Sequence, residues 1–159
     1  MSNEYILMVG PPGAGKSTWI NDFLKENDKE WVIISSDNII MEMAEPEGLS
    51  YSDAFNKFAK KAMVEMNHRL KNAIKNGDNI IHDQTNMTVK SRAKKISQAT
   101  GYIKKAIVFE LAEDELRRRL DKRKKEDGKT IPEYVVENML NSYIRPSKAE
   151  GFTHVHMIT

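Results

Sequence analysis

Segment 10–18 restricts the fold of this chain more strongly than any other part of the sequence. It reads Gly-Pro-Pro-Gly-Ala-Gly-Lys-Ser-Thr and fits the pattern G-x-x-x-x-G-K-[ST], which needs a strand before it and a helix after it. The apolar run 5–9 has the length and β-branched content of a buried parallel strand. Behind the motif, apolar residues recur at helical spacing, at Trp19, Ile20, Phe23 and Leu24. The segment is therefore predicted to be a phosphate-binding loop between a strand and a helix.

Gly13 and Gly15 let the backbone of this loop turn with no side chain in the way. Successive amide N–H groups can then point at one centre, and the helix that follows adds its positive N-terminal end. Lys16 would reach the β- and γ-phosphates of ATP, and the Ser17 hydroxyl would ligate Mg²⁺. A plain strand-to-helix turn is the alternative, but the motif with both correct flanks argues against it. The residues expected to bind the nucleotide are Gly13, Ala14, Gly15, Lys16, Ser17 and Thr18.

Composition narrows the classes of protein to consider. The 159 residues, 40% hydrophobic and 30% charged, are typical of one globular domain, predicted over 1–159. The net charge of +2 is too small to indicate nucleic-acid binding by itself. The absence of cysteine excludes disulfides and thiolate metal sites. Because there is no signal-peptide pattern and no apolar run of the roughly 18–20 residues that cross a membrane, we expect a cytoplasmic protein without a membrane partner.

Strand and helix patterns alternate along the chain. After the first pair, buried strands are predicted at 31–35, 79–82, 106–109 and 155–158. The longest helix is predicted at 50–76, and its apolar stripe, which includes Phe55, Met63 and Met66, is assigned to the core. The alternation predicts an α/β fold with a five-stranded parallel sheet and helices on both faces. In such a sheet a binding site lies outside the carboxyl ends of the strands.

Polar residues follow two of these strands at the same predicted edge. Asp37 follows the strand 31–35, and Asp83 follows 79–82 and begins an Asp-Gln-Thr-Asn cluster that ends at Asn86. A carboxylate on this edge could accept the proton of an attacking hydroxyl or hold Mg²⁺, directly or through a water. Capping of a helix N-terminus explains Asp37 equally well, so both interpretations stay open for it. For Asp83 a turn or capping role is the alternative, and the polar cluster favours a functional role.

The helix predicted at 113–126 carries a dense set of basic residues. Arg119 and Arg123 are four residues apart, so their side chains project from one face. Two arginines one turn apart can clamp phosphates in the transition state if this helix belongs to a mobile lid. For most of the neighbouring basic residues, i,i+4 pairing with acidic residues on a solvated helix is the better interpretation. The segment 124–129 is predicted to be the flexible tip of the lid.

These residues together resemble the polynucleotide 5′-hydroxyl kinase family, in its phage-type kinase domain, over nearly the whole length of the chain. The most specific parts of the resemblance are the motif 10–19, Asp37, the segment 83–86, and Arg119 and Arg123 followed by Ile131-Pro132. The resemblance implies a P-loop kinase fold with a helical lid at about 113–130. It also implies that Asp37 is the general base, that Arg123 contacts the donor phosphates with Arg119 beside it, and that Asp83 lies at the active-site end of its strand.

Two further observations concern the acceptor. The phage member of the family carries an acceptor-binding arginine three positions after the general base, where this chain has Ile40. The region 83–133 is also similar to the P-loop domain of heterogeneous nuclear ribonucleoprotein U, which we regard as an RNA-associated module that binds nucleoside triphosphates. No phosphatase domain is recognisable, so the chain would be a stand-alone kinase.

The leading hypothesis is ATP-dependent transfer of the γ-phosphate to a hydroxyl of a nucleic acid, with the 5′-hydroxyl end of DNA or RNA as acceptor. Its site residues are Lys16, Asp37, Arg119 and Arg123 for catalysis, Ser17 for Mg²⁺, and Asp37, Asp83 and Asn86 for the acceptor. A second hypothesis changes the acceptor to a nucleoside or a hydroxylated base within DNA, for which Ile40 is the reason. A third is a module that binds nucleoside triphosphates without an acceptor, against which Asp37 argues.

Overall fold

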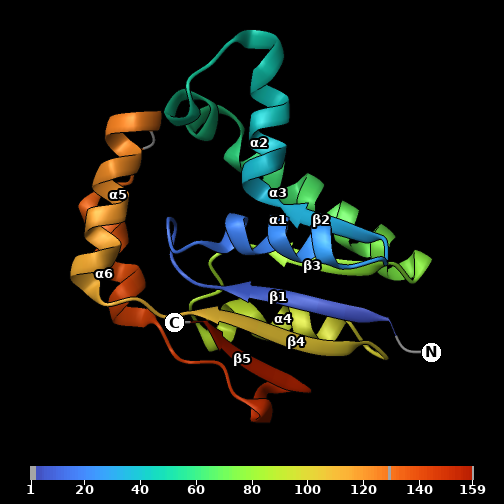
Figure 1. Ribbon diagram of the computed structural model, residues 1–159. Helices are drawn as coiled ribbons and strands as arrows, with labels where there is room; N and C mark the ends of the chain where they lie inside the picture. Colours follow the sequence, from blue (N-terminus) through green and yellow to red (C-terminus); the bar gives the residue numbers. More distant parts are fainter. Residues whose placement is uncertain (1–2, 129, 159) are drawn as a thin grey trace.

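The structure, a computed structural model, describes residues 3–128 and 130–158 of the chain (Figure 1). Its strands form one parallel sheet in the order β2-β3-β1-β4-β5, with β1 in the middle. The phosphate-binding loop therefore starts from the centre of the carboxyl edge of the sheet. The strands are β1 (Glu4–Val9), β2 (Trp31–Ser35), β3 (Asn79–Asp83), β4 (Ile103–Phe109) and β5 (His154–Ile158).

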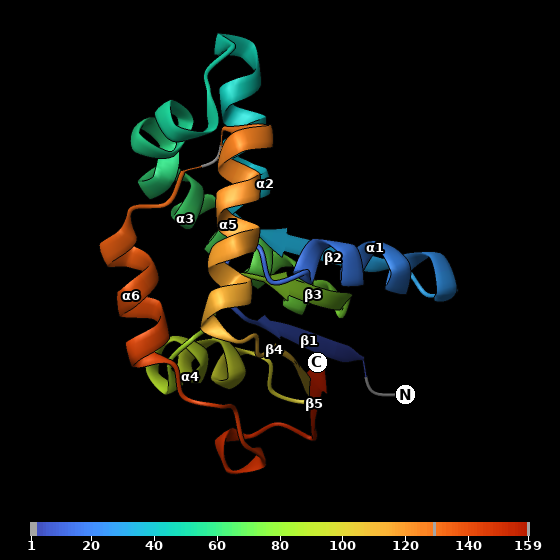
Figure 2. The same ribbon diagram turned by 60° about the vertical axis from the view of Figure 1, so that its left-hand side comes forward.

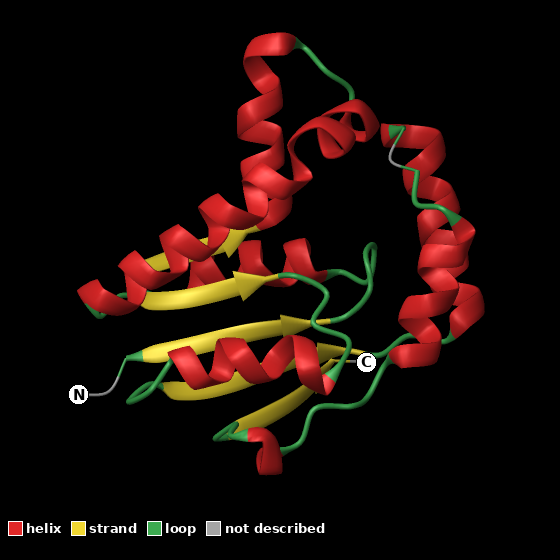
Figure 3. Cartoon of the chain, turned by 180° about the vertical axis from the view of Figure 1, so that it is seen from behind, coloured by secondary structure: helices red, strands yellow, loops and turns green. Residues whose placement is uncertain are grey.

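Helices cover both faces of the sheet. They are α1 (Lys16–Glu26), α2 (Ser36–Ala44), α3 (Tyr51–Asn76), α4 (Val89–Gln98), α5 (Glu113–Asp127) and α6 (Glu133–Ser142), with short 3₁₀ turns η1 (Glu45–Glu47) and η2 (Lys148–Glu150). α1 packs on one face, and α3 and α4 pack on the other, where Figure 3 shows them in front of the strands. Figures 1 and 2 show α2, α5 and α6 beyond the carboxyl ends of the strands. The predicted α/β fold with a five-stranded parallel sheet is confirmed.

The central strand β1 explains why the sheet needs cover on both faces, because successive side chains of a strand point to opposite sides. Tyr5, Leu7 and Val9 join the cluster under α3 and α4, and Ile6 and Met8 join the cluster under α1. All of these side chains are at most 2% exposed. Burying an aliphatic side chain contributes about 1.5–3 kcal/mol relative to leaving it in water. The strand that leads into the phosphate-binding loop is thus fixed from both sides.

Among the residues that the structure describes, no helix has both the length and the apolarity that a membrane crossing requires.

In helix α3, two residues of the predicted apolar stripe are exposed instead of buried. Ser50 caps the helix by accepting the Asp53 N–H at 3.2 Å, and Met66 is buried at 1% exposure as expected. Phe55 and Met63, which were assigned to the core, are instead 47% and 42% exposed. The reason is length: the 26 residues of α3 span about 39 Å, more than twice the length of a five-residue strand. The first turns of α3 therefore extend past the sheet edge, and the assignment of Phe55 and Met63 to the core was wrong.

A fully buried arginine on α4 fixes the segments around the carboxyl edge. Arg92 is 0% exposed, and its Nε donates to Glu150 Oε1 at 2.8 Å in η2. Its Nη1 donates to the backbone oxygen of Asn86 at 2.8 Å, and its Nη2 donates to that of Ile144 at 2.9 Å. The Ile144 N–H in turn donates to the backbone oxygen of Met87 at 2.9 Å. These bonds hold the end of α6 and the loop after β3 in one place.

Candidate active site

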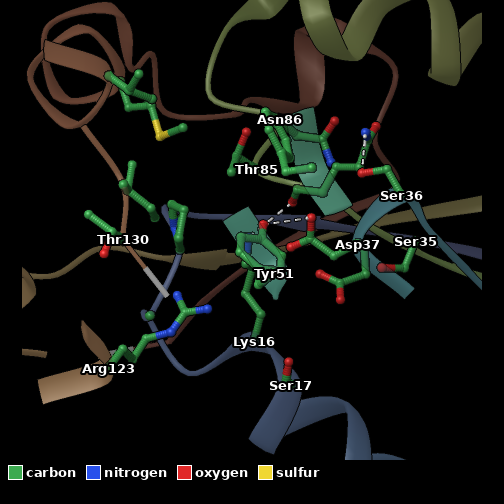
Figure 4. A pocket seen from close by; sticks show the side chains of 18 of the residues that line it. Lys16, Ser17, Ser35, Ser36, Asp37, Tyr51, Thr85, Asn86, Arg123 and Thr130 are labelled. Carbon is green, nitrogen blue, oxygen red and sulfur yellow. Dashed lines mark hydrogen bonds between the residues drawn. The ribbon is translucent and has the colours of Figure 1, made fainter. Parts of the chain in front are cut away.

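A cavity of about 1060 Å³ lies at the carboxyl ends of the strands, where the sequence predicts the site (Figure 4). Its walls come from the phosphate-binding loop, the first turns of α2 and α3, the loop after β3, α4, α5 and α6. Of the residues assigned from the sequence, Ala14 and Arg119 do not line it. Those that do are Gly13, Gly15, Lys16, Ser17, Thr18, Asp37, Asp83, Asn86 and Arg123. Their chemical roles stay predictions.

The path of the phosphate-binding loop depends on two glycines. A Cβ on Gly10 would lie 2.9 Å from Phe109 Cβ, so only glycine lets the loop pass the end of β4 so closely. Gly13 has φ 80°, a left-handed conformation that side chains disfavour. The Gly10 N–H donates to the backbone oxygen of Thr85 at 2.9 Å, which joins the loop to the segment after β3. Helix α1 then begins at Lys16, so its first N–H groups face the cavity.

Lys16 lies between the loop and the end of β3. Its Nζ donates to the backbone oxygens of Gly10 at 2.8 Å and of Gln84 at 3.3 Å. Burial lowers the pKa of Lys16 to about 8, although the charges of Asp83 and Asp37 act in the opposite direction. An ammonium group has three N–H donors, so one of them is left for an anion in the cavity. A phosphate there would favour the protonated form.

Asp37 lies in the first turn of α2, but it does not cap that helix. The cap is Ser35, whose hydroxyl accepts the Asn38 N–H at 3.3 Å. The capping interpretation of Asp37 is therefore wrong, because the helix begins at Ser36, earlier than capping by Asp37 requires. The exposed Asp37 carboxylate instead accepts a hydrogen bond from the Tyr51 hydroxyl at 3.1 Å (Figure 4). Burial and the charge of Asp37 raise the pKa of Tyr51 to about 12, so the phenol stays protonated and remains a donor.

Asp83 is the last residue of β3 and pairs in register with Ser35 at the end of β2. The two strands thus bring Asp37 and Asp83 to the same edge of the sheet. Burial raises the pKa of Asp83, the Lys16 ammonium opposes this change, and the nearby Asp37 adds to it. The next helix, α4, is capped by Thr88, so Asp83 is not needed as a cap either.

Asn86 shapes the loop after β3. It is 2% exposed and has φ 49°, a left-handed conformation that asparagine tolerates better than most residues. Its side-chain N–H donates to the backbone oxygen of Met8 at 2.7 Å, and its Oδ1 accepts a hydrogen bond from Lys95. Both polar groups of the side chain are thus bound to protein atoms. The predicted contact of Asn86 with an acceptor stays a prediction.

Helix α5 places two arginines over the phosphate-binding loop. Arg119 donates from Nη1 to the backbone oxygen of Ala14 at 3.1 Å and from Nε to Glu115 at 2.9 Å. Arg123 lies so close that its Cδ would be 3.4 Å from a Cβ on Gly13. With the residues that the structure describes, Arg123 makes no hydrogen bond or ion pair, which leaves its guanidinium available to the cavity.

The other basic residues of α5 behave as a solvated helix, as the alternative interpretation proposed. Arg117 pairs with Glu113 at 2.9 Å, Arg118 with Glu115 at 2.7 Å, and Lys125 with Asp121 at 2.9 Å. Such exposed pairs contribute little to stability, about 0–1 kcal/mol each. Of the predicted lid tip 124–129, residue Lys129 lies outside the described residues. That α5 moves as a lid stays a prediction.

Sequence reasoning missed several residues of the cavity wall. Tyr51, Phe55 and Met63 reach it from α3, and Lys95 reaches it from α4. None of them belongs to a motif, and each comes from a helix whose pattern indicates only an amphipathic surface element. The single available signal was the position of Tyr51, directly after the helix cap Ser50.

Comparisons with known proteins agree with this architecture. A family model described as AAA domain matches residues 6–146. Heterogeneous nuclear ribonucleoprotein U-like protein 2 of Homo sapiens is 26% identical over 157 residues, which cover 96% of this chain and 21% of the relative. The chain thus spans about a fifth of the length of the curated relatives that it matches.

Solved structures show the same fold. In a structure of the Pnkp1/Rnl/Hen1 RNA repair complex, one chain is 26% identical, with a TM-score of 0.71, over 89% of this chain and 44% of that chain. Chaetomium thermophilum Kti12 in complex with ADP-AlF3 is 16% identical, with a TM-score of 0.65, over 98% of this chain and 88% of that chain.

These findings confirm the P-loop kinase fold and both resemblances that the sequence indicated. The family model matches most of the chain, from the middle of β1 to the segment after α6. The protein therefore belongs to the AAA domain family of P-loop proteins.

Proposed function

We propose that this protein transfers the γ-phosphate of ATP to a hydroxyl of a nucleic acid, with the 5′-hydroxyl end of DNA or RNA as the acceptor. The observation that carries the proposal is one cavity lined by Lys16, Asp37 and Arg123, which come from three separate elements. Ser35 already caps α2, so helix capping does not account for Asp37. The matches to a ribonucleoprotein and to an RNA repair complex support nucleic acid as the partner.

The reaction begins when the acceptor hydroxyl approaches Asp37. The carboxylate takes the hydroxyl proton while the acceptor oxygen forms a bond to the γ-phosphorus. The bond from that phosphorus to the oxygen that bridges it to the β-phosphate breaks, and ADP leaves with the electron pair. The hydrogen bond from Tyr51 holds the carboxylate in one orientation during this step. Lys16 and Arg123 stabilise the negative charge that spreads over the phosphate oxygens.

The site also suits a magnesium ion. Ser17 lines the cavity in the first turn of α1 with an exposed hydroxyl, an oxygen ligand of the kind that Mg²⁺ prefers. Asp37 and Asp83 line the same cavity and could hold the ion through water. A bound Mg²⁺ would neutralise charge on the β- and γ-phosphate oxygens.

A nucleoside or a hydroxylated base within DNA is the second candidate acceptor. The sequence favours it through Ile40, which stands where the phage enzyme has an arginine. In the structure Ile40 is 1% exposed and belongs to the core under α2, so this position does not face the cavity. The ribonucleoprotein relatives favour a third candidate, a module that binds nucleoside triphosphates and nucleic acid without transfer.

One labelling experiment separates these candidates. The protein is incubated with γ-labelled ATP and 5′-hydroxyl DNA, 5′-hydroxyl RNA, free nucleosides or hydroxymethylated DNA. We expect label on the 5′-hydroxyl ends, and none with Lys16→Ala, because Lys16 supplies the only lysine ammonium that bonds to this loop within 3–128 and 130–158. Label confined to nucleosides or to hydroxymethylated DNA would support the second candidate. Binding of ATP with no labelled acceptor in the panel would leave only the third.

A further inference from the structure

The side of the molecule that α3 and α4 cover carries positive charge that the proposed transfer does not use (Figure 3). Six lysines of these two helices are exposed, and in the ranges 3–128 and 130–158 none of the six forms an ion pair. None of them lines the cavity. We call this set the lysine face, and its members are Lys60, Lys61, Lys71 and Lys75 on α3 and Lys90 and Lys94 on α4.

Helical spacing directs the lysine face away from the sheet. On α3, Lys71 and Lys75 lie one turn apart, on the side opposite the buried Met66. The two lysines of α4 are also one turn apart, opposite the buried Ile96. Like charges one turn apart on a helix repel each other, so these pairs cost stability unless an anion lies over them. The lysine face therefore suits a partner with closely spaced negative charges.

Carboxylates that could neutralise the lysine face are scarce on these two helices. Between residues 57 and 76 the sequence has only Glu65, which pairs with Arg69 at 3.0 Å. Helix α4 contains no acidic residue. On the other side of the sheet, α1 and the segment after it expose more acidic than basic side chains, namely Asp22, Glu26, Asp28 and Glu30 against Lys25 and Lys29. The charge of the chain is thus unevenly distributed, and the lysine face produces a local positive field.

The residues among the lysines indicate which polyanion fits. Proteins bind single-stranded nucleic acid on aromatic side chains, but neither residues 59–76 of α3 nor α4 contain Phe, Tyr or Trp. Helices that lie in a membrane surface insert large apolar side chains, and on the outward side of α3 only Val64 is large, apolar and exposed. From Lys60 to Lys75 the helix axis covers about 22 Å, over which one strand of a B-form duplex carries about six phosphates. A double helix therefore fits the lysine face better than a single strand or a membrane.

We propose that the lysine face binds the phosphate backbone of double-helical nucleic acid, whatever its sequence. Lysines bind phosphates as point charges, and such contacts position a protein without reading bases. The inference goes beyond the proposed function, because the surface lies outside the cavity and serves equally a protein that binds nucleic acid without transfer. Asn56 lines the cavity one turn before Lys60, so the lysine face begins next to the cavity.

The binding test uses a duplex that cannot act as acceptor, a DNA of about 20 base pairs with phosphate on both 5′ ends. Its affinity is measured by fluorescence anisotropy, without ATP, between about 50 and 200 mM salt. We expect Lys71→Gln/Lys75→Gln to weaken binding about 3- to 30-fold at the lowest salt and to reduce the slope of log K against log salt by about 1–2. Lys90→Gln/Lys94→Gln should behave in the same way.

The matched control is Lys25→Gln/Lys29→Gln, which removes the same charge from the α1 side and should leave affinity and slope nearly unchanged. Equal losses in the control and in the α3 variant would overturn the surface, because net charge alone would then explain binding. An unchanged affinity and slope in either the α3 or the α4 variant would overturn it as well. Tighter binding to a single strand of the same length, or to vesicles of phosphatidylcholine and phosphatidylserine, would overturn the double helix as partner.

The labelling experiment on the proposed function fails or succeeds separately. If no acceptor is ever labelled but the α3 and α4 variants lose duplex affinity, the proposed transfer fails and the lysine face stands. If 5′-hydroxyl ends are labelled and all variants bind the duplex equally, the transfer stands and the lysine face fails.

Discussion

The sharpest prediction concerns Asp37→Asn, because the structure lets its effect on stability be separated from its effect on rate. The amide has the shape of the carboxylate and can still accept the Tyr51 hydrogen bond, but it cannot take a proton. We therefore expect a folded protein that binds ATP normally and transfers phosphate slowly.

The two effects differ in size. Ser35 caps α2, so the substitution removes only a first-turn charge, worth about 0.3–1 kcal/mol, and weakens one exposed hydrogen bond by about 1 kcal/mol. The free energy of unfolding should therefore fall by less than about 2 kcal/mol. Loss of a general base costs about 10²–10⁴ in rate, or about 2.7–5.4 kcal/mol in the barrier.

Single-turnover transfer with saturating ATP measures the chemical step, and denaturant unfolding measures stability. Asp53→Asn is the control, because Asp53 also stands in the first turn of an exposed helix start, that of α3, and does not line the cavity. It should change neither rate nor ATP affinity. A rate for Asp37→Asn within a few-fold of the unmodified protein would refute the role of Asp37 as base.

Three further predictions follow from contacts of the described residues. Arg123→Lys should lower kcat by roughly 10²-fold at low and high salt alike, because the planar guanidinium over the phosphate-binding loop is lost. Lys124→Ala should cause only a small, salt-sensitive loss of kcat with polymeric acceptors, and equal losses for the two variants would mean that the segment makes diffuse nucleic-acid contacts. Glu150→Gln should lower the free energy of unfolding by about 3–5 kcal/mol, measured by denaturant titration, because it leaves the charge of the buried Arg92 without its partner; a change below about 1 kcal/mol contradicts this. Because the pKa of Lys16 is lowered to about 8, ATP affinity should fall as pH rises from about 7 to 9, and ATP binding near pH 8.5 should take up a proton. Calorimetry in two buffers of different ionisation heat measures this proton uptake, and identical binding heats in the two buffers would contradict the prediction.

The parts of the fold that could be predicted are those that depend on local pattern. The motif 10–18 needs a strand and a helix at its flanks, and β1 and α1 are there. Asp37 and Asp83 could be placed on one edge because parallel strands end at the same side of a sheet. The same reasoning could not decide whether Asp37 caps its helix, since Ser35 and Asp37 are both good capping residues and a shift of two positions decides between them.

The rest of the site depends on distances that a local pattern does not contain. Phe55 and Met63 continue the same apolar stripe as Met66, and only the length of α3 relative to the strands takes them from the core into the cavity. Lys95 looks like any surface lysine of an amphipathic helix until the loop after β3 folds Asn86 against it. The contacts that made these residues part of the cavity come from segments far apart in the chain.

The buried Arg92 also anchors one part of the cavity wall by bonds that the rest of the wall lacks. It binds segments that are 52 and 58 residues away, so movement of the end of α6 would expose the buried charge or remove its hydrogen-bond partners. Helix α5 reaches the phosphate-binding loop through the partly exposed Arg119 and Arg123, whose contacts can break at little cost. The wall that α4 and the segment after α6 form is therefore held by hydrogen bonds of a buried charge, whereas α5 meets the phosphate-binding loop through partly exposed side chains.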